Sequence, residues 1–112
     1  MGMVENLEKM LAKGRDDAML RFGLGSAYFN DGKFPLAVTH LEACIAQDGS
    51  YSAAYKLVGK AYLKQGEPGK AISTFEAGMP IAEGQGDKQS RKEMQVFLGK
   101  AHKEMDNGQA DL

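Results

Sequence analysis

The stretch GLGSAYFNDG, residues 23–32, carries three glycines in ten residues, and its pattern returns as LVGKAYLKQG, residues 57–66. Four residues recur 34 positions later, namely Gly25, Ala27, Tyr28 and Gly32 as Gly59, Ala61, Tyr62 and Gly66. The same spacing continues downstream, where Ala37 returns as Ala71 and Leu41 returns as Phe75. A fixed period that covers two helical segments and the turn between them indicates a repeat protein.

The glycines themselves raise a second possibility, a loop that binds phosphate groups. Such a loop follows a β-strand and opens a helix. Here Asp16 and Asp17 suit a helix start, and Met19, Phe22 and Leu24 then follow at helical spacing. The glycines at 23 and 25 therefore lie inside a helix, where each costs about 1 kcal/mol relative to Ala. We expect them to permit the close approach of a second helix.

Partial copies of the repeat flank the two complete ones. The tripeptide Gly59–Ala61 reappears as Gly99–Ala101, now at a longer spacing, and residues 4–11 carry one apolar stripe that resembles a second helix. The periodicity predicts helices at about 3–13, 17–31, 34–48, 51–65, 68–83 and 89–106. We predict one all-α domain, an α-solenoid of antiparallel helix pairs. It comprises a capping helix (3–13), repeat 1 (17–49), repeat 2 (51–83), a partial third repeat or capping helix (89–106) and a frayed tail (107–112).

This pattern resembles the tetratricopeptide repeat family, which has the same period. The first copy supplies Leu24, Gly25, Tyr28, Ala37 and Leu41, and the second supplies Tyr55, Val58, Gly59, Tyr62, Ala71 and Phe75. The chain departs from the pattern at Arg21, where the family has an aromatic residue, and at Gly49 and Glu83, where it has proline. The resemblance implies a concave groove, lined by the first helix of each pair, that holds a peptide or helix of a partner protein.

Composition limits the partners and the location of the protein. The 112 residues have a formal net charge of −1, so there is no global attraction for nucleic acid or for an anionic membrane surface. No stretch approaches the roughly 18 apolar residues that span a bilayer, and residues 1–11 lack the layout of a signal peptide. We expect a cytoplasmic protein without nucleic-acid or membrane partners.

His40 and Cys44 are the residues that most resemble a catalytic or metal site. They are four positions apart on one helix, the spacing of a Cys–His dyad or of half a metal site. The competing interpretation places Cys44 at the family's small-residue position as a core side chain, and a zinc site requires four ligands. We favour the core interpretation and predict no catalytic residues, no metal and no cofactor.

The first helices carry the residues that we predict to line the groove. They are Met19, Phe22, Ser26, Phe29, Asn30, Lys56, Lys60, Leu63, Lys64, Lys100 and Lys103. The family's two-carboxylate clamp is absent, because Phe22, Ser26, Leu57, Glu93 and Phe97 stand at its Lys, Asn and Arg positions. We predict a groove that is aromatic at one end and basic at the other, and a protein or peptide partner that is acidic with an apolar anchor.

The alternative function is structural. Only two repeats are complete, so a half-exposed terminal face, such as that of the last helix near Val96 and His102, offers a surface for homo-oligomerisation.

Overall fold

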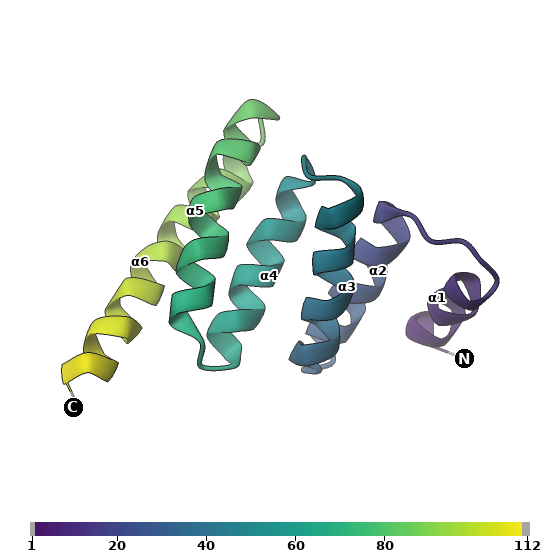
Figure 1. Ribbon diagram of the computed structural model, residues 1–112, viewed down its shortest axis with the longest axis horizontal. Coiled ribbons are helices and arrows are strands. Elements are labelled where there is room, and N and C mark those ends of the chain that lie inside the picture. Colours follow the sequence, from purple (N-terminus) through teal and green to yellow (C-terminus); the bar gives the residue numbers. More distant parts are fainter. Residues whose placement is uncertain (1, 111–112) are drawn as a thin grey trace.

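The computed structural model describes residues 2–110, which form six α-helices and contain no β-strand. The helices are α1 (Met3–Ala12), α2 (Ala18–Asn30), α3 (Phe34–Gln47), α4 (Ser52–Lys64), α5 (Pro68–Gly84) and α6 (Lys88–Ala110). They form a stack with α1 at one end and α6 at the other, and in this view α2 lies behind α3 and α6 passes behind α5 (Figure 1). The molecule measures 48 × 32 × 19 Å, the elongated shape of a helical stack. The predicted all-α solenoid is confirmed.

Helix boundaries follow local signals in the sequence, and the first five helices begin and end within one residue of their predicted limits. The Asp17 carboxylate caps α2 by accepting a hydrogen bond of 2.8 Å from the backbone N–H of Leu20. Pro35 and Pro68 lie in the first turns of α3 and α5. Gly32 follows α2 with φ +76°, a left-handed conformation that favours glycine.

The last helix extends past residue 106, where the sequence prediction ends it. Helix α6 continues to Ala110, so residues 107–110 of the predicted frayed tail are helical. The remainder of the predicted tail, residues 111–112, lies outside the described residues. The reason is local. Asp106 stands where the first two copies have Gly32 and Gly66, and without a glycine there the helix has no stop signal.

Glycines allow the two helices of each pair to come close. A Cβ atom at Gly25 would lie 2.4 Å from Leu41 Cγ, and one at Gly59 would lie 2.2 Å from Phe75 Cε1. Both neighbours are fully buried, so neither side chain has free space into which to move. The predicted close approach at Gly25 is therefore present, and Gly59 repeats it in the second pair. Gly23 makes a looser contact, with its Cβ position 3.5 Å from Leu7.

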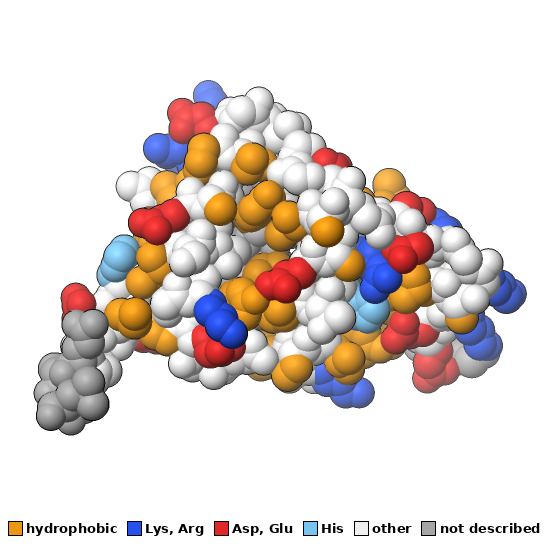
Figure 2. Space-filling view, viewed as in Figure 1, with side chains coloured by type: hydrophobic (Ala, Val, Ile, Leu, Met, Phe, Trp, Pro, Cys, Tyr) orange, Lys and Arg blue, Asp and Glu red, His pale blue; other side chains and the backbone are white. Residues whose placement is uncertain are grey.

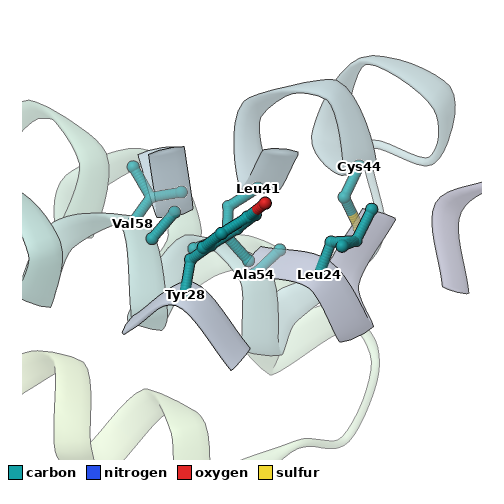
Figure 3. Packing of buried hydrophobic residues seen from close by; sticks show 7 residues of the cluster. Leu24, Tyr28, Leu41, Cys44, Ala54 and Val58 are labelled. Carbon is teal, nitrogen blue, oxygen red and sulfur yellow. The ribbon is translucent and has the colours of Figure 1, made fainter. Parts of the chain in front are cut away.

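The buried side chains form two clusters along the stack. Figure 3 shows the N-terminal cluster, in which Leu24, Tyr28, Leu41, Cys44, Ala54 and Val58 from α2, α3 and α4 pack together. The C-terminal cluster joins α5 to α6 through Ala71, Phe75, Ala82, Met94 and Ala101. Tyr62 packs against both clusters and so links them.

A repeated tyrosine–glutamate contact ties α2 to α1 and α4 to α3, in each case a first helix to the second helix that precedes it. Tyr28 Oη donates a hydrogen bond of 2.6 Å to Glu8 Oε2, and Tyr62 Oη donates to Glu42 Oε1. Glu8 and Glu42 are themselves one repeat period apart, so the contact belongs to the repeat. The hydrogen bond to Glu8 raises the pKa of Tyr28 to about 12, which keeps the phenol protonated as a donor.

The face of the molecule in Figure 2 exposes apolar side chains over the middle of the stack. A shallow hollow of about 290 Å³ lies between α3, α4 and α5, and it is lined by Glu42, Ile45, Tyr55, Val58, Ser73, Thr74 and Ala77. Among residues 2–110, none of the helices is long and apolar enough to cross a membrane.

Candidate partner-binding surface

A cleft of about 770 Å³ lies between the first turn of α1 and α2. Phe22, Ser26 and Asn30 line it from α2, one helical turn apart, because residues four positions apart share a helix face. Met3, Val4 and Glu5 line it from α1. The Phe22 ring is held by stacking on Tyr51, with the ring centroids 4.9 Å apart. The cleft thus combines a fixed aromatic wall with polar groups.

Two of the predicted residues, Phe29 and Lys60, meet Phe97, which is not among the predicted groove residues. Lys60 Nζ, on α4, lies 5.6 Å from the centroid of Phe29 on α2 and 5.0 Å from that of Phe97 on α6. These distances are within the range of cation–π attraction. One side chain therefore links the first helices of all three copies of the repeat.

The two rings are positioned by further aromatic contacts. Phe29 meets Phe34 edge-on with centroids 5.3 Å apart, and Phe97 stacks on the buried Phe75 with centroids 6.2 Å apart. Since Phe75 also fills the notch at Gly59, packing of the helix pair fixes Phe97 as well. A buried core residue, Phe75, thus positions one of the two rings beside Lys60.

The lysines of the predicted groove differ in their surroundings. Lys56 forms an ion pair with Glu93, at 3.3 Å between Nζ and Oε2, so its charge is balanced within the chain. Lys100 Nζ lies 5.1 Å from the centroid of Phe97, the same ring that Lys60 faces. Within residues 2–110 neither Lys60 nor Lys100 has an ion pair with a carboxylate. Two cations are thus available beside one aromatic ring.

The other predicted residues join neither group. Leu63 is half-buried and packs against the C-terminal cluster. Met19 is 69 % exposed. Lys64 and Lys103 are exposed, and among the described residues they form none of the ion pairs or ring contacts.

Sequence reasoning misses several residues of this surface. It treats Phe97 only as a departure from the clamp, although a clamp position faces the groove and so carries the signal. The α1 residues Met3 and Val4 have no such signal, because no repeat position marks a contact between a capping helix and α2. Tyr51 precedes α4, and its stacking on Phe22 joins two repeats, which the pattern of one repeat does not specify.

His40 and Cys44 have the surroundings of core residues. His40 is 7 % exposed, stacks on Tyr28 at 5.5 Å and lies with Nδ1 3.1 Å from Arg21 Nη1. Cys44 is fully buried, and burial raises the pKa of its thiol to about 11. A buried thiol that resists deprotonation is a poor nucleophile. In the described part of the chain, His, Cys, Asp and Glu form no group of three that could hold a metal ion.

Comparison with known proteins places this arrangement in a family. The tetratricopeptide repeat profile matches residues 22–86. The TPR repeat-containing protein PA0015 of Pseudomonas aeruginosa is 51 % identical over 98 residues, which cover 88 % of this chain and 93 % of that protein.

Solved structures share the fold. The solution structure of protein BPP2914 from Bordetella parapertussis is 40 % identical, with a TM-score of 0.81 over 93 % of this chain and 90 % of that one. The TPR2B domain of yeast Sti1, solved in complex with pHsp70, has a TM-score of 0.82 at 21 % identity, over 89 % of this chain and 80 % of that one. The chain belongs to the tetratricopeptide repeat family, whose members are generally non-catalytic protein–protein interaction modules.

Proposed function

We propose that this protein binds a segment of a partner protein across α2, α4 and α6, and that the segment carries acidic groups together with a large apolar side chain. The observation that carries the proposal is the position of Lys60 between Phe29 and Phe97. The three residues come from three successive first helices, the helices that line the groove in this family.

The basic residues of this surface are the reason for proposing acidic groups in the partner segment. Lys60 and Lys100 flank the ring of Phe97 and have no carboxylate partner within residues 2–110. These two ammonium groups are available to carboxylates of a partner that binds beside the ring, whereas Lys56 is already paired with Glu93. An exposed ion pair contributes only about 0–1 kcal/mol, so acidic groups alone give weak binding.

The cleft between α1 and α2 is the reason for proposing a large apolar side chain in the partner segment. Val4, Phe22 and Ala27 supply apolar surface to its wall. Burial of one large apolar side chain there contributes about 1–3 kcal/mol. Because the cleft and the Lys60 site both include residues of α2, one extended or helical segment can reach both.

The partner differs from the ligands of the two-carboxylate clamp. Phe22 and Ser26 replace the Lys and Asn of that clamp on the first helix, and both line the cleft instead. The complex with pHsp70 is a property of the Sti1 domain, which shares the fold with this chain. We therefore propose recognition by an aromatic and basic surface of a different composition.

The experiment is a titration of three peptides, one acidic, one apolar and one mixed, against the wild type and two variants. Lys60→Met removes the ammonium but keeps an unbranched stem between the rings. Lys92→Met, on the exposed surface of α6, removes an equal charge elsewhere and is the control. We expect the mixed peptide to bind best. Lys60→Met should weaken it several-fold and reduce its salt dependence, and Lys92→Met should not.

Equal weakening by both variants would mean that only the total charge matters, and the proposed site would be wrong. Binding of the apolar peptide as tightly as the mixed one would remove the acidic requirement. The cytoplasmic location predicted from the sequence needs a separate localisation experiment. We also propose a scaffold role, which a pull-down experiment would test.

A further inference from the structure

Helix α6 has an unfilled notch at Gly99. Gly99 stands in the third copy where Gly25 and Gly59 stand in the first two, and those glycines receive Leu41 of α3 and Phe75 of α5. At Gly99 an added Cβ meets nothing within 4 Å. Since glycine inside a helix costs about 1 kcal/mol relative to Ala, the notch has a cost without a packing benefit in the isolated chain. Within residues 2–110, α6 is a first helix without its second.

Helix α1 has the opposite deficiency. Leu7 precedes Leu41 by one repeat period, so α1 has the register of a second helix. In this register Met3 and Met10 correspond to Ala37 and Cys44, which are fully buried against α2.

The methionines are not covered in the same way. Met3 is 67 % exposed and Met10 is 40 % exposed, and α1 contains no buried residue. Among the described helices α1 contacts only α2, the first helix that follows it. The side of α1 that would face its own first helix is therefore open.

We propose that α1 of a second copy of this chain packs on α6, with Leu7 in the notch at Gly99, so that the copies associate head to tail. Helices α1 and α6 lie at opposite ends of the stack (Figure 1), so one contact of this kind leaves an α1 free at one end of the pair and an α6 free at the other. The contact continues the packing that joins α2 to α3 and α4 to α5.

Charge and side-chain chemistry agree with this occupant. Helix α1 carries two acidic residues and one basic residue, whereas α6 carries five basic and three acidic residues. The helices thus attract each other. The half-buried Leu98 and the flexible Met10 would meet in this register, and methionine adapts to irregular apolar surfaces. Around them, the exposed Gln95 and His102 form a polar rim.

Self-association of this kind is heterologous and does not close on two copies. Average mass should rise steadily with concentration. An isologous contact between two α6 helices would instead stop at the dimer.

The test uses variants that block one face each. Gly99→Leu fills the notch; its Cβ has open space and Leu favours a helix, so the monomer should fold at least as well as the wild type. Gly108→Leu is the matched control, a second open glycine of α6 outside the repeat register. Met10→Glu blocks the other face and places a carboxylate near Arg15, which already donates to the Met10 sulfur at 3.5 Å.

Sedimentation velocity across a concentration series gives the result. We expect wild type and Gly108→Leu to associate, and Gly99→Leu and Met10→Glu to need at least tenfold higher concentration. A mixture of the two blocked variants should form a dimer and nothing larger, since one supplies an intact α1 and the other an intact α6. Three outcomes would overturn the proposal: a wild type that stays monomeric up to about 1 mM, association of Gly99→Leu equal to that of wild type, or dimers of Met10→Glu alone, which would indicate an α6–α6 contact.

Discussion

Gly25, Gly59 and Gly99 occupy the same position of the repeat, but different side chains face them. Substitutions at this position therefore test the packing role of a single residue. Gly59→Ala places a methyl group 2.2 Å from the ring of the buried Phe75, whereas Gly99→Ala places it in open space. We expect the first change to lower the free energy of unfolding by about 1–3 kcal/mol through overpacking. The second should raise it by up to about 1 kcal/mol through helix propensity.

Urea denaturation at low protein concentration measures both changes. Because the two glycines share their repeat position and are both followed by Lys and Ala, the comparison reports mainly the effect of the facing side chain. Equal effects of the two substitutions would contradict the packing role assigned to Gly59.

Gly78 shows where reading the sequence at the residue scale falls short. A Cβ there would lie 2.5 Å from Tyr55 Cβ and 2.8 Å from Met94 Sδ, so this glycine also permits a close approach. It follows Cys44, the small residue of the first copy, by one repeat period, and this spacing could have identified it. By contrast, the Lys60 site depends on the side-chain directions of three helices, which no period specifies.

At the scale of elements, a polar network on α2 and α3 makes stability depend on pH. His40 accepts a hydrogen bond from Arg21 only as the neutral imidazole, and the Asp16 carboxylate holds the same guanidinium at 2.8 Å. Burial lowers the pKa of His40; the Glu8 and Asp16 carboxylates oppose this shift, and the Arg21 charge adds to it. Between the lowered pKa and about 6.5 the unfolded chain binds more protons, so stability falls as pH falls through this range.

We therefore expect wild type to lose more stability than His40→Gln between pH 7.5 and 5.5. The amide of Gln can still accept from Arg21 but does not titrate in this range. The slope from one group cannot exceed about 1.4 kcal/mol per pH unit. Denaturation at both pH values checks the difference, and parallel losses in the two proteins would show that His40 is not the titrating group. Asp16, with its pKa lowered to about 2 by Arg21 and Gln47, contributes only at more acid pH.

Elements are the features that the sequence specifies best. Five helices match within one residue because Asp17, Pro35, Pro68 and the turn glycines act locally. The sequence prediction ends α6 four residues too early. Asp106 replaces the turn glycine, and a missing stop signal does not say where the helix ends instead. The tyrosine–glutamate contacts are missed because they join neighbouring repeats, and the amphipathic pattern of one helix does not identify its partner across the stack.

At the scale of the whole molecule, each helix contacts only near neighbours, and the two buried clusters share Tyr62 but little else. Stability in such a stack is the sum of local terms, so a change at one end should remain local. Leu7→Ala removes packing between α1 and α2. We expect faster amide hydrogen exchange in those two helices, and unchanged exchange in α5 and α6, at a concentration where the protein is monomeric.

Phe75→Leu, in the C-terminal cluster, should reverse the pattern, with faster exchange in α4, α5 and α6 and protection retained in α2. If either variant instead accelerates exchange in every helix equally, the six helices unfold as one cooperative unit, and Tyr62 couples the clusters more strongly than their separate packing implies.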